Sequence, residues 1–254
     1  MTPTASIILV NYKTPKQTKL CLRSLRRFTR SPCETIVVDN RSEDESTEYL
    51  RGLPWIRFLE NDNPEPTHRN GLDLGIRHAS GDVIVAIHTD TFVREEGWLK
   101  TLLGHFGSNT MILGSQDRVI LPVSRLNRFD VHRKRRKLNR RWKAKGRSPK
   151  CLTHCIVYRR ELFTEHGQRF DHPEWIDGVY YDTGELIQRY CDERALEIRL
   201  LAREQLAPLF WHFEAATLNH VNRRSLPFKR RWRTWQFYRR ADVQGILADD
   251  SLDS

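Results

Sequence analysis

Residues 69–91 read RNGLDLGIRHASGDVIVAIHTDT, and this stretch decides the fold class. Its first half carries apolar or small residues at the three- and four-residue spacing of a helix face: Leu72, Gly75, Ile76 and Ala79. Gly81 and Asp82 then mark a turn, and residues 83–87 form a β-branched apolar run of strand length. The run stops abruptly at His88-Thr89-Asp90. The stretch predicts a helix, a turn and a buried strand that ends in polar side chains.

The same alternation runs through most of the chain. Strands are predicted at residues 6–10 (SIILV), 35–38 (TIVV), 56–58, 83–87, 111–113, 151–158 and 198–201. Helices are predicted from the start signals at 14–17 (TPKQ) and 42–45 (SEDE), and over 97–106, 161–166 and 185–196. Alternating strands and helices predict an α/β fold with a mostly parallel sheet covered on both faces.

The composition is compatible with one principal domain of 254 residues. Residues 133–150 hold eleven Lys or Arg and no acid, so the remaining 32 basic and 32 acidic residues balance and the net charge of +11 is local. We expect residues 126–150 to form a flexible basic loop. Five cysteines without paired CxxC clusters favour reduced thiols, and the lack of a long apolar run or signal pattern favours a cytoplasmic protein.

Polar side chains follow several of the predicted strands: Asn11, Asp39, Asn40, His88 and Asp90. Ligands of parallel α/β sheets bind beyond the carboxyl ends of the strands. These residues are therefore the first candidates for a binding site.

Four blocks in this order and spacing resemble the family 2 glycosyltransferases of the GT-A fold: residues 7–14 (IILVNYKT), 36–42 (IVVDNRS), 69–91 and 175–189. The resemblance extends over about residues 6–212 and implies an inverting enzyme. Such an enzyme moves a sugar from a UDP-, dTDP- or GDP-linked donor to an acceptor hydroxyl. It also implies a single catalytic domain over residues 1–222, with a donor-binding half at 1–115 and an acceptor half at 151–222. Residues 223–254 would be a basic, aromatic C-terminal helical tail.

The resemblance implies that Asn11, Tyr12 and Asp39 hold the nucleoside. A tyrosine face can stack on a base, and a carboxylate can accept from a base N–H or a ribose hydroxyl. Arg69 and Asn70 match the family motif near the donor. The competing structural interpretations are that Asp39 caps a loop and that Asn70 caps a helix.

The metal motif of the family is DxD, and here it reads His88-Thr89-Asp90. The resemblance implies that Asp90 ligates Mn²⁺ or Mg²⁺ on the donor diphosphate, and that His212 is a further ligand. His88 could contact the donor or, as an imidazole ligand, favour Mn²⁺ over Mg²⁺. A histidine among aromatic residues, as in 209–212 (LFWH), is otherwise more often a packed core residue.

The resemblance also implies a catalytic base before a helix, in 181–189 (YDTGELIQR). One alignment puts Thr183 at the catalytic position, and one extra residue puts Asp182 there. Because a carboxylate can accept a hydroxyl proton at neutral pH, chemistry favours Asp182. Asp177 is the second candidate, and an N-terminal helix cap is the structural interpretation of Asp182.

The basic loop and the aromatic, basic residues of 226–238 point to an anionic or lipid-linked glycan acceptor of bacterial surface polysaccharide. They also point to contact with the inner face of a membrane. The alternatives are a nucleic-acid-binding protein, which would lack a recognisable motif, and a non-catalytic homologue. A nucleotide-sugar pyrophosphorylase would need a glycine-rich loop, and residues 6–15 contain no glycine.

Overall fold

The structure is a computed structural model that describes residues 4–116, 136, 140, 151–152, 154–212 and 228–254. The basic loop predicted at 126–150 lies outside the described residues, apart from Arg136 and Arg140. Its predicted flexibility therefore stays a prediction. The boundary predicted between residues 222 and 223 also lies outside them.

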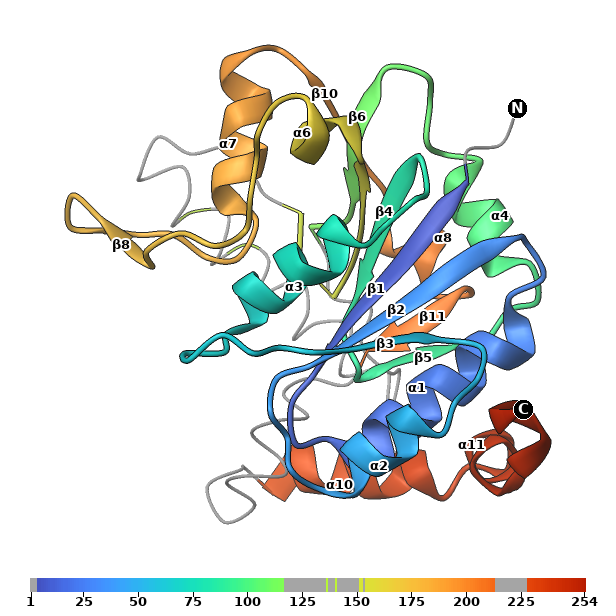
Figure 1. Ribbon diagram of the computed structural model, residues 1–254. Helices are drawn as coiled ribbons and strands as arrows, with labels where there is room; N and C mark the ends of the chain where they lie inside the picture. The colour runs from blue at the N-terminus through green and yellow to red at the C-terminus, as the bar shows by residue number, and fades with distance from the viewer. Residues whose placement is uncertain (1–3, 117–135, 137–139, 141–150, 153, 213–227) are drawn as a thin grey trace.

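A seven-stranded sheet forms the centre of the molecule (Figure 1). Its strands are β1 (Ala5–Asn11), β2 (Cys33–Asp39), β3 (Arg57–Glu60), β4 (Val83–Ile87), β6 (Thr110–Gly114), β7 (Cys155–Arg159) and β10 (Glu197–Leu200). They follow the spatial order β10-β6-β7-β4-β1-β2-β3. β7 is antiparallel to β4 and β6, and the other pairs are parallel. The prediction of a mostly parallel α/β sheet is confirmed.

Helices cover both faces of this sheet because its strands are apolar on both sides. One face packs against α1 (Pro15–Phe28), α2 (Glu45–Arg51), α4 (Trp98–Leu103), α8 (Arg203–Leu206), α10 (Phe228–Tyr238) and α11 (Ala241–Ala248). The other packs against α3 (His68–Arg77), α6 (Glu161–Thr164) and α7 (Glu185–Glu193). Along β1, Ile7 and Leu9 belong to the first cluster while Ile8 and Val10 belong to the second. This is the alternation of a strand buried on both sides.

Two predicted helix starts differ from the structure in detail. Pro15 does begin α1, but the Thr14 hydroxyl donates to Asn11 Oδ1 instead of capping the helix. The capping box predicted at 42–45 is wrong, because α2 begins at Glu45 and the Asp44 carboxylate accepts from the Ser46 amide. The expected helix starts were found within a few residues, whereas their capping contacts were not.

Two short sheets were not predicted from the sequence. β5 (Thr91–Val93) pairs antiparallel with β11 (Phe210–His212), and β8 (Trp175–Ile176) pairs with β9 (Val179–Tyr180). Strands of two or three residues are too short to show a period-two pattern. Both of these sheets carry residues of the candidate site.

The C-terminal segment shares the core of the main domain. Phe237, Val243, Ile246 and Leu252 are all buried in the same cluster as α1 and α4. The fully buried guanidinium of Arg23 joins α1 to the helix η2 (Asp250–Asp253), donating through Nε to Asp253 Oδ1 at 2.9 Å. These ion pairs of Arg23 with Asp250 and Asp253, called the clasp below, connect the C-terminal end of the chain to α1.

None of the helices among the described residues is both long and apolar enough to cross a bilayer. All five cysteines are free thiols, and four of them are buried.

Candidate functional site

The site begins where β1 and β2 end side by side, because Asn11 and Asp39 are partners in the parallel register. Asn11 Nδ2 donates to Asp39 Oδ1 at 2.6 Å. Its Oδ1 accepts from the hydroxyls of Thr14 and Thr18, and the residue has no exposed surface. Asn11 therefore positions the Asp39 carboxylate by a hydrogen bond. A direct contact between Asn11 and a donor stays a prediction.

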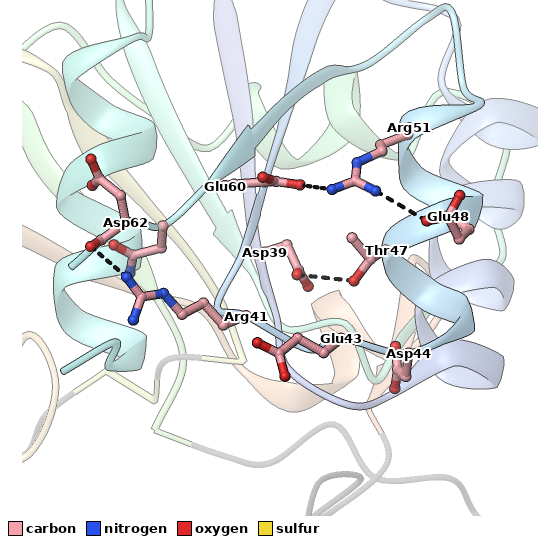
Figure 2. A pocket seen from close by; sticks show the side chains of 10 residues that line it. Asp39, Arg41, Glu43, Asp44, Thr47, Glu48, Arg51, Glu60 and Asp62 are labelled. Atoms are coloured by element: carbon pink, nitrogen blue, oxygen red, sulfur yellow. Dashed lines mark hydrogen bonds and ion pairs between the residues drawn. The ribbon is translucent and has the colours of Figure 1, made fainter. Parts of the chain in front are cut away.

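Asp39 lies at the base of a pocket of about 530 Å³ at the ends of β2 and β3 (Figure 2). Its carboxylate also accepts from the Ser42 amide at 3.0 Å and the Thr47 hydroxyl at 3.2 Å. The pocket is lined by Asp39, Arg41, Glu43, Asp44, Thr47, Glu48, Arg51, Glu60, Asn61 and Asp62.

Acidic side chains dominate this lining, and both of its arginines are already engaged. Arg51 pairs with Glu48 and Glu60, and Arg41 Nη2 donates to the Asp62 carbonyl oxygen at 2.7 Å. Figure 2 shows these pairs on opposite sides of Asp39. The pocket therefore offers hydrogen-bond acceptors, which suit the N–H and hydroxyl groups of a nucleoside better than a free anion.

The loops that leave β1 and β2 have an unusual backbone. Lys13, Arg41 and Glu43 have positive φ angles of 52°, 55° and 50°. Such left-handed conformations cost about 1–3 kcal/mol each for residues other than glycine, and they cluster at binding sites. Tyr12, the residue that follows β1, keeps 41% of its surface exposed. Stacking of the Tyr12 ring on a donor base stays a prediction.

Arg69 and Asn70 both have partners within the protein. The buried Arg69 guanidinium donates to the carbonyl oxygens of His172 at 2.9 Å and Tyr181 at 2.8 Å. Asn70 completes a capping box at the start of α3, where Thr67 is the capping residue. Arg69 thus fixes both ends of the segment that contains β8 and β9, and donor contacts of Arg69 and Asn70 stay predictions.

The turn 88–90 joins β4 to β5 and is held at several points. The His88 amide donates to the His154 carbonyl oxygen at 3.2 Å, and the Thr91 hydroxyl donates to the same oxygen at 3.2 Å. The Thr89 hydroxyl lies 3.2 Å from that of Thr14. Because His154 just before β7 and Thr14 just before α1 both contact it, the turn presents Asp90 in a fixed position.

His88, Asp90 and His212 form a cluster at this turn. His212 Nε2 lies 2.9 Å from Asp90 Oδ1, and His88 Nδ1 lies 3.9 Å from the same oxygen. One ligand atom from each residue lies within 4.8 Å of the other two. His212 reaches Asp90 because it pairs with Thr91 in the β5–β11 ladder. The sequence-predicted metal residues are thus brought together.

Two further histidines surround the cluster. The His68 ring lies 5.1 Å from that of His88, and the His154 ring lies 5.1 Å from that of His212. Burial lowers the pKa of His68 to about 4. Burial and the neighbouring His68 lower the pKa of His88 to about 3. Both imidazoles are neutral at pH 7, which is the form that binds metal ions.

Asp182 is exposed and lies just before α7. Its amide donates to Glu185 Oε2 at 3.0 Å, and the Glu185 amide donates to the Asp182 carbonyl oxygen at 3.0 Å. Burial lowers the pKa values of His68 and His88, and the negative charge of Asp182 acts in the opposite direction on both. Glu185 serves here as a helix-start residue.

Gly184 allows this approach to α7 to pack closely. Its φ is 73°, and a Cβ atom there would lie 2.7 Å from the buried Tyr158 hydroxyl. Any other residue would be strained and would collide with β7. The fold therefore fixes the backbone beside Asp182.

Asp177, the second candidate base, lies at the tip of the β8–β9 hairpin. Asp177 and Gly178 have φ angles of 50° and 72°, and such a pair of positive values is required by a type I′ turn. The strands below carry Trp175 and Tyr180, whose exposed rings are 5.5 Å apart. Asp177 is thus explained as a turn residue, and the hairpin presents an aromatic pair near Asp182.

Sequence reasoning missed several residues of this region: His68, His154, Trp175 and Tyr180. His68 directly precedes the motif block that starts at Arg69, and a histidine at a helix start was its only signal. The Asp177-Gly178 pair between apolar residues was a usable hairpin signal.

Several solved structures are similar to this chain in fold. The mannosyltransferase PcManGT from Pyrobaculum calidifontis, in complex with GDP-Man and Mn²⁺, is 12% identical with a TM-score of 0.51, covering 100% of this chain and 85% of that one. Glucosyl-3-phosphoglycerate synthase from Mycobacterium tuberculosis, with Mn²⁺ and UDP, is 20% identical with a TM-score of 0.48, covering 64% of this chain and 58% of that one. TarS from S. aureus, residues 1–349 with UDP-GlcNAc, is 17% identical with a TM-score of 0.44, covering 66% and 48%.

The chain thus spans only 58% of the synthase structure and 48% of the TarS structure. No curated protein matches the sequence. The family model described as Glycosyl transferase family 2 matches residues 6–167, which include β1 to β7, the pocket and the turn 88–90. With most of its length matched in this way, the chain belongs to glycosyl transferase family 2.

Proposed function

We propose that the chain is an inverting glycosyltransferase that moves a sugar from a nucleoside-diphosphate donor to an acceptor hydroxyl. The observation that carries the proposal is that Asp39 ends β2 and Asp90 follows β4, two strands that flank β1 in one parallel sheet, and that His88 and His212 cluster with Asp90. The charge of Asp182 also acts on His88. A donor needs acceptors for its nucleoside, ligands for a cation on its diphosphate and a base beside the sugar. These residues supply each of them.

The donor nucleoside occupies the pocket of Figure 2 in this proposal. Tyr12 stacks on the base, and Asp39 and Asn61 accept from its N–H groups or from ribose hydroxyls. Asn11 acts through Asp39 as a positioning residue. The candidate donors are UDP-, dTDP- and GDP-linked sugars.

The residues at the turn fit a divalent cation. Among the described residues, the buried Nε2 of His88 and Nδ1 of His212 have no hydrogen-bond partner, and one ligand atom from each of His88, Asp90 and His212 lies within 4.8 Å of the other two. His88, Asp90 and His212 would hold the ion. When bound, Mn²⁺ or Mg²⁺ neutralises charge on the diphosphate leaving group. Because two of the three ligands are imidazoles, we expect Mn²⁺ to bind more tightly than Mg²⁺.

Asp182 is the proposed catalytic base. Its carboxylate accepts the proton of the acceptor hydroxyl as that oxygen bonds to the anomeric carbon of the sugar. The bond from the anomeric carbon to the diphosphate oxygen breaks in the same displacement, and the anomeric configuration inverts. Backbone contacts of Asp182 with Glu185 and of Arg69 with Tyr181 keep the base in position.

The proposed acceptor is a glycan of a surface polysaccharide, either anionic or lipid-linked. The exposed Trp175 and Tyr180 rings on the hairpin before Asp182 support this, since aromatic faces stack against the C–H faces of sugar rings. Residues 151–222 then form the acceptor half and residues 1–115 the donor half. We place the reaction in the cytoplasm at the inner face of the membrane.

Two other functions make different predictions. A nucleic-acid-binding protein would need a basic surface, whereas the pocket described above is acidic. A non-catalytic homologue would keep the fold and could bind a donor, but it would not turn the donor over.

A panel of UDP-, dTDP- and GDP-sugars in a thermal-shift assay, with and without Mn²⁺, tests the proposal. We expect one donor to raise the melting temperature and Mn²⁺ to increase that shift, because ligands that bind only the folded state stabilise it. Hydrolysis of the stabilising donor in the absence of acceptor then reports turnover. No stabilisation by any donor, with Mn²⁺ present, would refute the function, and donor binding without any turnover would favour the non-catalytic homologue.

A further inference from the structure

The helix α10 carries a row of exposed aromatic side chains. Phe228, Trp232 and Trp235 are 78%, 45% and 47% exposed. Their spacing of four and three residues places them on one face of the helix. The rings stack in sequence, with centroids 6.2 Å apart for Phe228 and Trp232 and 4.8 Å apart for Trp232 and Trp235. The row forms a continuous apolar strip on the surface.

This strip does not serve to attach the helix to the domain. The attachment is made by Phe237, which is buried and packs edge-on against Phe92 at 5.5 Å. Lys16 of α1 also places its Nζ 4.3 Å above the Tyr238 ring. The core-facing side of α10 is therefore packed through Phe237. The exposure of the three rings on the aromatic row is not accounted for by this packing.

The sequence of α10 contains basic residues and no acidic ones. Arg231 and Arg239 are exposed beside it, and the Arg239 guanidinium lies 4.5 Å from the Trp235 ring. Residues 223–240 contain eight Lys or Arg and no acid. A surface with this composition attracts anions.

We propose that this face of α10 lies on an anionic lipid bilayer. Phe228, Trp232 and Trp235 enter the headgroup region, and Arg231 and Arg239 contact lipid phosphates. A helix with aromatic residues on one face and cations at its border is the kind that lies in the interface plane. Tryptophan is preferred at this depth because its ring is apolar and its N–H is polar.

Two other occupants fit the surface less well. Single-stranded nucleic acid binds aromatic residues by stacking bases on free ring faces, whereas these rings already stack on one another. A second copy of the chain on the same face would bring like charges together, because a twofold contact pairs identical patches.

The position of α10 relates this surface to the site. In Figure 1 the helix lies below α1 and α2, toward the end of the sheet where β1 and β2 finish. Phe92, which packs against Phe237 of α10, is two residues from Asp90. Burial and the negative charge of Asp90 raise the pKa of Tyr238, the last residue of α10. A bilayer under α10 would lie beside the catalytic edge, so that a lipid-linked acceptor could reach Asp182. This last step rests on the proposed function, but lipid binding itself does not.

Co-sedimentation of the full chain with vesicles tests the proposal. We expect binding to vesicles with about 30% phosphatidylglycerol, and little binding to pure phosphatidylcholine, because the attraction is to anionic headgroups. The double variant Trp232→Ser/Trp235→Ser should bind at least about tenfold more weakly. Leu200→Ser, which changes an exposed apolar side chain on β10, should bind like the wild type.

The charge contribution has its own pair of variants. Arg231→Gln/Arg239→Gln should weaken binding, whereas Arg199→Gln, an exposed change on β10, should not. Because all these side chains lie on the surface, unchanged melting temperatures will show that the variants fold.

Equal vesicle binding by the wild type and the Trp232→Ser/Trp235→Ser variant would overturn the proposal. So would binding to a single-stranded oligonucleotide, or self-association, that depends on the same residues while vesicles are not bound. Donor-induced thermal shifts of these variants are read separately. A variant that no longer binds vesicles but is still stabilised by the donor supports the lipid-binding proposal independently of the proposed function. If the wild type binds the donor but no vesicles, only the lipid-binding proposal is refuted.

Discussion

His212 Nε2 lies 2.9 Å from Asp90 Oδ1, although the two residues are far apart in the sequence. The β5–β11 ladder makes this contact, because it pairs His212 with Thr91. The strand β11, near the C-terminal end of the described chain, thus completes a cluster that begins at the end of β4.

His212→Ala should weaken Mn²⁺ binding by at least about tenfold, because it removes one of three ligands and leaves Asp90 without its neighbour. Isothermal titration with Mn²⁺ measures the change directly. His78→Ala, an exposed histidine at the end of α3, serves as the control. Equal Mn²⁺ affinity in both variants would exclude His212 as a ligand.

His88→Asp should shift the metal preference toward Mg²⁺. The variant replaces an imidazole with a carboxylate, and oxygen ligands suit Mg²⁺ better than nitrogen ligands do. The ratio of the Mn²⁺ and Mg²⁺ dissociation constants, measured for wild type and variant, gives the answer. An unchanged ratio would show that His88 does not contact the ion.

Asp182→Asn should reduce kcat by about 10²–10⁴-fold while donor affinity stays the same, because the amide cannot accept the acceptor proton. Asp177→Asn is a matched control, since Asn-Gly also forms type I′ turns and the hairpin should be preserved. If Asp177→Asn instead abolishes transfer and Asp182→Asn does not, the roles of the two residues are reversed.

Tyr12→Ala should lower the affinity for the donor nucleotide by about tenfold, the low end of the range for losing a stacked base. Tyr12→Phe keeps the ring and should bind like the wild type. Nucleotide titration of both variants is informative because the side chain is exposed and neither change should affect folding. Weak binding by the phenylalanine variant would point to the hydroxyl instead of the ring face.

Asp253→Asn should lower the free energy of unfolding by about 3 kcal/mol at neutral pH, because the fully buried Arg23 loses a partner. Asp242→Asn, which breaks the more exposed pair with Arg240, should cost less than about 1 kcal/mol. Urea unfolding of both variants provides the comparison. Equal losses would mean that the buried clasp contributes no more than a surface pair.

The effect of Asp253 should also depend on pH. Burial alone would raise the pKa of Asp253, but hydrogen bonds from Arg23 and Tyr49 outweigh it and lower the pKa below its usual value. The clasp therefore contributes its full stability above the unfolded value of about 4, and loses it as pH falls through the lower folded value. The difference between wild type and Asp253→Asn should shrink below about pH 4.

The sequence predicted the parts of the site that depend on local order. Asp39 and Asp90 could be found because each follows a buried strand, and the ends of parallel strands meet at one edge. The sequence could not reveal that Asn11 is fully buried, because its burial depends on contacts with Thr14, just before α1, and with Thr18 of α1.

Long-range pairing was also beyond local patterns. β5 and β11 have three residues each, and the direction of β7 between β4 and β6 leaves no mark on its composition. On α10, both tryptophans and Phe237 are apolar, and only the docked helix distinguishes the exposed rings from the buried one.

The insertion of β7 between β4 and β6 has a consequence for the order of assembly. β1 to β4 are consecutive in the chain and form one continuous half of the sheet, in the order β4-β1-β2-β3, so that half can form early. The open side of β4 must then wait for β7, and only afterwards can β6 and β10 join through it. β11 brings His212 to Asp90 later still in the chain. Tight binding of a metal ion would therefore report that β11 has paired with β5, because only this pairing brings His212 to Asp90.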